Sequence, residues 1–144
     1  MTRSKRMEPV KSFADERERD AGEQVAHARR ALEDAERQLK QLRDYRAEYL
    51  TRISGGAADG VRLQNYHAFL GRLASAIEQQ DRQVATLLGD LERATDTWRE
   101  RRIEAAALSR AVDKIAVGER RAAEQRAQRE ADERAMQRSL ITRD

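Results

Sequence analysis

Mostly apolar positions recur along this chain at alternating steps of three and four residues. In the first half the positions are Val25, Ala28, Leu32, Ala35, Leu39, Leu42, Arg46, Tyr49 and Ile53, and the same register extends back to Ala21 and Ala14. In the second half they are Leu63, Tyr66, Leu70, Leu73, Ile77, Gln80, Val84, Leu87, Leu91, Ala94, Trp98, Arg101, Ala105, Leu108, Val112 and Ile115. A repeat that averages 3.5 residues puts one apolar stripe on each helix and predicts a coiled coil.

The two stripes are separated by the stretch SGGAADG, residues 54–60. Its three glycines interrupt both helices, and the side chain of Asp59 suits the first exposed N–H groups of the second helix. Because so short a connection joins helices that run back along each other, we expect an antiparallel pair.

The first helix is expected over about residues 10–54 and the second over about 61–138. Pro9 suits a first helical turn, and Ser12 followed by Asp15 resembles a capping box. The predicted fold is all-α, a single antiparallel two-helix coiled-coil hairpin over residues 1–144, with the second helix longer than the first.

The periodicity leaves two alignments of the helices open. The single Trp98 faces Ala14 in one of them and Ala21 in the other, a small residue in both cases. In either alignment the second helix has no intramolecular partner beyond about residue 110, so its C-terminal arm is expected to face solvent.

The composition agrees with a long, solvated helical pair. Charged residues make up 38% of the chain and aromatic residues 4%, and the formal net charge is only +3, with acids and bases interleaved. Such mixing argues against a nucleic-acid-binding face, which is usually clearly basic. The chain has no cysteine, and no apolar run approaches the roughly 18 residues that a membrane span requires. We therefore expect a cytoplasmic protein that does not insert into a membrane.

No arrangement of residues suggests catalysis or a cofactor. His27 and His67 lie on different helices and belong to no metal-binding pair, and the glycines at 55–60 are not followed by the Lys-Ser or Lys-Thr of a phosphate-binding loop. We predict no catalytic residue, no metal site and no cofactor.

Three blocks lie around the glycine-rich stretch: ERQLKQLRDYRAEYLTRI at 36–53, NYHAFLGRLASAIEQQ at 65–80 and WRERR at 98–102. Together they resemble the FliJ family of the bacterial flagellar type III export apparatus. The resemblance extends over about residues 33–140. It depends on the order and spacing of the blocks and not on any single block.

The resemblance implies a non-enzymatic protein that looks like the central stalk of a rotary ATPase. Its terminal half would enter the hexameric flagellar export ATPase, and its turn end would face the cytoplasmic domain of the export gate. The implied partners are that ATPase and its regulator, the gate, and the chaperones of flagellar export substrates. The implied location is the cytoplasm, peripheral to the inner face of the cell membrane at the flagellar base.

The resemblance also implies a gate-binding surface, carried by Phe69, Leu73, Ala76 and Gln80. Their steps of four, three and four residues form one helical stripe. The two apolar stripes meet in a seam between the helices. Tyr45, which lies beside this seam, is a possible further contact near the turn of the hairpin.

For Phe69 the sequence leaves a second interpretation open, in which its ring lies across the first helix and shields Leu39 or Leu42 from water. At the level of function, two alternatives also remain. One is the equivalent stalk of a virulence type III secretion system, and the other is a generic coiled-coil scaffold or nucleic-acid-binding hairpin.

Overall fold

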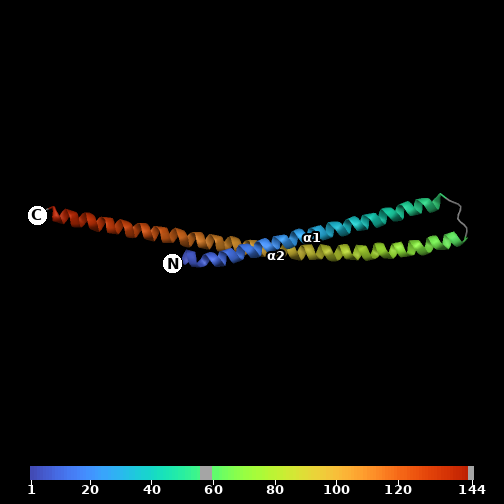
Figure 1. The fold of residues 1–144 in the computed structure, drawn as a ribbon, viewed down its shortest axis with the longest axis horizontal. Helices are drawn as coiled ribbons and strands as arrows, with labels where there is room; N and C mark the ends of the chain where they lie inside the picture. The colour runs from blue at the N-terminus through green and yellow to red at the C-terminus, as the bar shows by residue number, and fades with distance from the viewer. Residues whose placement is uncertain (56–59, 143–144) are drawn as a thin grey trace. The chain divides into compact units, whose positions relative to one another are not determined.

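The structure, a computed structural model, describes residues 1–55 and 60–142. Those residues form two α-helices, α1 (Arg3–Ser54) of 52 residues and α2 (Gly60–Ile141) of 82 residues (Figure 1). The predicted helical hairpin with a longer second helix is confirmed. The cap predicted at Asp59 lies outside the described residues. Within the described part of the chain, neither helix is long and apolar enough to cross a membrane.

The chain divides into two compact units, which both contain parts of both helices. The turn unit is Asp20–Arg99, and the terminal unit is Met1–Arg19 together with Glu100–Asp144. In the turn unit, Gln80 contacts Ala35 and Tyr66 contacts Tyr49, so the residue numbers run in opposite directions on the two helices. In the terminal unit Ser4 contacts Glu119 and Arg17 contacts Glu104, so each unit is an antiparallel helix pair.

The core is the seam that the heptad pattern predicts. Within the described ranges the buried apolar residues are Ala21, Val25, Leu32, Ala35, Leu39, Leu73, Ile77, Ala105 and Val112, and each occupies a seam position. In the turn unit, Leu39, Leu73 and Ile77 form one cluster, against which Leu42, Phe69 and Val84 pack. Because a two-helix pair has no second layer, this narrow stripe provides almost all of its apolar burial.

Near the glycine-rich stretch the seam is filled by aromatic rings. The ring centroids of Tyr49 and Tyr66 lie 5.6 Å apart in an edge-on arrangement, and those of Tyr49 and Phe69 lie 4.5 Å apart. Bulky side chains between helices increase the distance between their axes. This agrees with the divergence of α1 and α2 toward the turn (Figure 1) and with the exposure of two predicted seam residues, Arg46 and Leu63.

Trp98 lies over Gly22. Gly22 is next in sequence to Ala21, which is one of the two residues predicted to face Trp98. A Cβ atom at Gly22 would lie only 3.3 Å from the indole Nε1, closer than ordinary van der Waals contact. The glycine therefore leaves the space that the indole occupies. Large residues commonly face small ones across a packed interface in this way.

The N-terminus of α1 differs from the prediction, because the helix begins at Arg3 rather than near residue 10. Thr2 caps it, with its hydroxyl oxygen accepting a hydrogen bond from the Lys5 N–H at 3.3 Å. Glu119 of α2 adds a second cap, since its carboxylate accepts bonds from the Ser4 N–H at 3.0 Å and the Ser4 hydroxyl at 2.5 Å. Pro9 accordingly lies inside the helix, not in its first turn.

The earlier start of α1 lengthens the paired part of α2. Pairing reaches Glu119 instead of ending near residue 110, and Val112 is buried. From residue 120 to residue 142 every side chain is exposed. Polar contacts in this arm are local, such as the Gln128 amide bonding to Asp132 at 3.1 Å. The prediction of a solvent-facing C-terminal arm is therefore correct, but the arm is shorter than expected.

Replacing Ile77 by alanine should lower the free energy of unfolding by about 2 kcal/mol, because Ile77 is buried in the central cluster. Leu88→Ala, on an exposed face of the same helix, should change the free energy by less than about 0.5 kcal/mol. Urea unfolding followed by circular dichroism measures both values. Equal losses in the two variants would contradict the assignment of the core to the seam.

The cap between Glu119 and Ser4 should respond to acid. The two bonds from Ser4, its hydroxyl first and its N–H second, lower the pKa of Glu119 from its ordinary 4.5. The cap's contribution to stability is therefore full above about pH 4.5 and is lost as the pH falls through the lowered pKa.

The nuclear magnetic resonance shift of the Ser4 amide proton reports this titration directly. We expect a midpoint below 4.5 in the wild type and no such transition in Glu119→Gln. A midpoint at or above 4.5 would show that the carboxylate does not accept these bonds in solution.

Candidate functional surface

The residues expected at the gate-binding surface all lie in the turn unit, but they differ in exposure. Leu73 is buried in the seam, whereas Phe69, Ala76 and Gln80 are half-buried. Tyr45, on α1, is the most accessible of the five, with 47% of its surface exposed. Tyr45 therefore exposes the largest fraction of its side chain to a partner, and Leu73 exposes almost none.

Phe69 of α2 packs across the seam onto α1. Its ring centroid lies 4.5 Å from that of Tyr49 and 6.0 Å from that of Tyr45, the latter pair at 72°. The guanidinium carbon of Arg72 lies 5.9 Å from the Phe69 centroid. The ring therefore contributes to intramolecular packing, as the second interpretation of its position expected, and its outer side adjoins the exposed ring of Tyr45.

Gln80 holds the two helices together through its side-chain amide. The amide nitrogen donates to the backbone carbonyl of Ala35 at 2.9 Å and to the side-chain oxygen of Gln38 at 3.2 Å. A polar residue in a coiled-coil seam restricts the alignment of the helices when its hydrogen bonds are satisfied in only one register. Gln80 is thus an internal contact of the hairpin.

A shallow groove opens beside Tyr45 and connects two of the predicted residues. It is lined by Gln38, Gln41, Leu42, Tyr45 and Gln80. Three of these residues offer side-chain amides and two offer apolar surface, a combination that suits contact with a protein. The periodic pattern did not distinguish Gln38 and Gln41 from other solvent-facing residues, because their role depends on the neighbouring helix.

Charged pairs surround this surface. Arg43 of α1 bonds to Asp81 of α2 at 3.0 Å, which joins the helices beside the groove. On α1, Lys40 donates to Asp44 at 2.8 Å, and this bond raises the pKa of Lys40. Desolvation, with smaller contributions from Tyr66 and Tyr45, raises the pKa of Tyr49 as well.

Among residues 1–55 and 60–142, no cluster of histidine, cysteine, aspartate and glutamate side chains could hold a metal ion. The surface formed by Tyr45, Phe69 and the groove, which we call the turn surface, is the strongest candidate for a functional site in this unit.

Comparison with known proteins gives concordant matches. The family model described as "Flagellar FliJ protein" matches residues 3–141. A "Flagellar FliJ protein" of Salmonella typhi is 32% identical over 99 residues, which are 67% of this chain and 67% of that protein. A "Flagellar FliJ protein" of Escherichia coli (strain K12) is 31% identical over 96 residues, or 65% of each. The family match covers both helices and includes the whole turn surface.

Gln80→Ala should lower the free energy of unfolding by about 1 kcal/mol, because it removes two hydrogen bonds between the helices. Gln79→Ala is the matched control, since Gln79 is exposed on the same turn of α2. Urea unfolding compares them under identical conditions. A control that loses as much stability as Gln80→Ala would mean that the hydrogen bonds seen here do not stabilise the pair.

Proposed function

Because this chain belongs to the FliJ family of non-enzymatic flagellar export proteins, we propose that it is a stalk that couples the hexameric flagellar export ATPase to the export gate. In this proposal the terminal unit contacts the ATPase ring and its regulator, and the turn surface contacts the cytoplasmic domain of the gate. The chain also handles the chaperones of export substrates. It works in the cytoplasm, against the inner face of the cell membrane at the flagellar base.

The exposed ring of Tyr45 beside Phe69 is the observation that carries the proposed gate contact. Seam packing explains why Leu73 is buried and why one side of Phe69 contacts Tyr49. It does not explain an aromatic ring on α1 that is 47% exposed and lies 6.0 Å from Phe69. Aromatic rings grouped at an accessible edge are typical of the residues that dominate protein–protein binding.

The groove next to these rings strengthens the proposal. Gln38 and Gln41 supply hydrogen-bonding groups around Leu42 and Tyr45, so a partner segment could bury apolar surface while its polar groups stay paired. Leu73 then acts on binding indirectly, because it holds α1 and α2 in the alignment that forms the groove. Gln80 bonds across the two helices and also lines the groove. Ala76, half-buried on the same stripe, leaves room for the close approach of a partner.

A two-helix coiled coil is suited to coupling, because its helices keep their side-chain contacts in register along the axis. The two units present different groups, with the rings of Tyr45 and Phe69 and the glutamine amides at the turn surface and the group of Arg17, Arg101 and Glu104 in the terminal unit. Two partners can therefore bind to separate parts of the same pair of helices.

Removing the Tyr45 ring should weaken binding to the gate. We expect Tyr45→Ala to reduce affinity for the purified cytoplasmic domain of the gate by about tenfold, the effect of losing about 1.4 kcal/mol of contact energy. Phe69→Ala should reduce it at least as much. Leu88→Ala removes an exposed leucine elsewhere on the turn unit and should bind like the wild type.

Isothermal titration calorimetry measures the affinities, and circular dichroism and thermal unfolding show whether each variant keeps its helices. Tyr45 is the sharper test, because Phe69 also packs within the hairpin and its loss affects stability. If Tyr45→Ala remains helical and binds as tightly as the wild type, the turn surface is not the gate contact. If the wild type does not bind the domain at all, the coupling role itself fails.

A further inference from the structure

A second accessible apolar surface lies in the terminal unit, on the side of α1 that bears Val10 and Phe13. Phe13 is 61% exposed and Val10 is 53% exposed, in a chain that has only two phenylalanines and is 38% charged. Both side chains line a groove between the helices, together with Ala14 and Arg17. Large apolar side chains that share an exposed groove indicate a binding surface more strongly than isolated ones do.

The opposite wall of this groove, on α2, consists of Glu104, Ala107, Leu108 and Ala111, and both alanines are exposed. Val10 and Phe13 on α1 are large, whereas the two alanines on α2 are small. The space above the alanines can therefore hold a bulky side chain from a partner. An additional helix lying between α1 and α2 has the geometry to supply such side chains at every turn.

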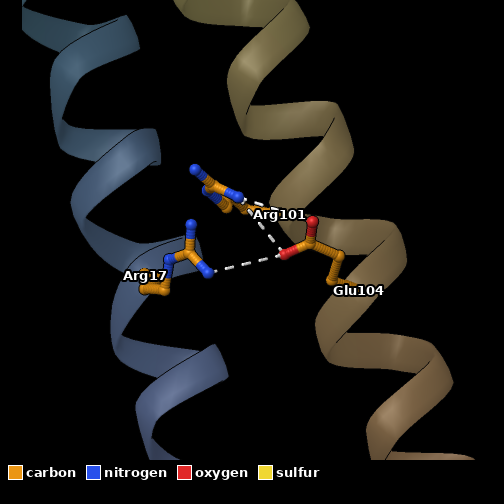
Figure 2. Close-up of polar contacts among 3 residues, drawn as sticks. All are labelled: Arg17, Arg101 and Glu104. Atoms are coloured by element: carbon orange, nitrogen blue, oxygen red, sulfur yellow. Dashed lines mark hydrogen bonds and ion pairs between the residues drawn. The ribbon is translucent and has the colours of Figure 1, made fainter.

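One end of the groove carries a positive charge that is only partly neutralised. Figure 2 shows the guanidinium groups of Arg17 and Arg101 both directed at Glu104. They lie 3.9 Å and 3.3 Å from the same carboxylate oxygen, Oε2. Two cations share one anion, so an acidic side chain of a partner has a favourable position beside them.

Arg17 also connects this charged end to the apolar wall. Its guanidinium carbon lies 5.7 Å from the centroid of the Phe13 ring. A cation above an aromatic face holds both groups in place. The groove thus presents an ordered apolar ring directly beside a positive charge.

The first turns of α1 extend this positive character. Residues 3–11 contain Arg3, Lys5, Arg6 and Lys11 with one acid of their own, Glu8, and the Glu119 carboxylate of α2 bonds to Ser4 among them. The charge of these first turns therefore favours an acidic occupant at that end of the groove.

We propose that the groove lined by Val10, Phe13, Ala107 and Ala111 binds an acidic amphipathic helix of another protein, which becomes a third helix of the terminal unit. An apolar residue of that helix packs between Phe13 and the two alanines, and an acidic residue one turn away pairs with Arg17. This inference does not depend on the proposed function. It concerns residues outside the turn surface, and its test needs neither the ATPase nor the gate.

The test uses the full chain and a designed helical peptide of about 21 residues. The peptide carries leucine at the a and d positions of three heptads and glutamate at the e and g positions, which keeps it from pairing with itself. A second peptide has lysine in place of each glutamate. Fluorescence anisotropy of the labelled peptides measures their affinity for the wild type and for two variants.

We expect the acidic peptide to bind the wild type and to bind Phe13→Ser at least about tenfold more weakly. Ile103→Ser is the matched control, because Ile103 is 68% exposed in the same unit but does not line the groove. It should bind the peptide within about twofold of the wild type. The lysine peptide should bind at least about tenfold more weakly than the acidic one.

Three results would overturn the proposal. The first is no measurable binding of the acidic peptide to the wild type while the chain is fully helical by circular dichroism. The second is equal weakening by Phe13→Ser and Ile103→Ser, and the third is equal affinity for the two peptides. Sedimentation of the chain alone tests the other occupant, since self-association that Phe13→Ser abolishes would assign the groove to a second copy.

Discussion

The burial of apolar side chains between α1 and α2 is the interaction on which the rest of this structure depends. The pair has no sheet or further helix to pack against within the described chain, and its buried residues are confined to the seam. The alignment of the seam sets which side chains meet across it. Both candidate surfaces lie where the two helices meet, so each exists only while that alignment holds.

Polar contacts make the alignment specific within each of the two units. In the turn unit Gln80 bonds to the Ala35 carbonyl, and in the terminal unit Glu119 bonds to the N-terminal turn of α1. A shift of one helix along the other would leave these groups without their partners, at a cost that apolar contacts alone would not impose. The seam provides the attraction, and the polar contacts select one of its possible registers.

The sequence predicted the helices and the seam because a 3.5-residue repeat is a local property, visible without knowledge of the partner helix. It misplaced the start of α1 because Pro9 and Ser12 are local cues, whereas the cap from Glu119 comes from a residue 115 positions away. It also left the orientation of Phe69 open, since a residue beside the seam can turn toward either helix. The groove beside Tyr45 was not predicted, because it depends on how side chains from two helices fit together.

The central claim is that one chain binds the export ATPase and the export gate at the same time. Sedimentation velocity with purified ATPase hexamer, gate domain and this chain tests it most directly, with the gate domain labelled for detection. We expect the labelled domain to sediment with the hexamer when the chain is present and separately when the chain is omitted. If the gate domain displaces the chain from the hexamer, the two partners compete, and the chain does not act as a stalk between them.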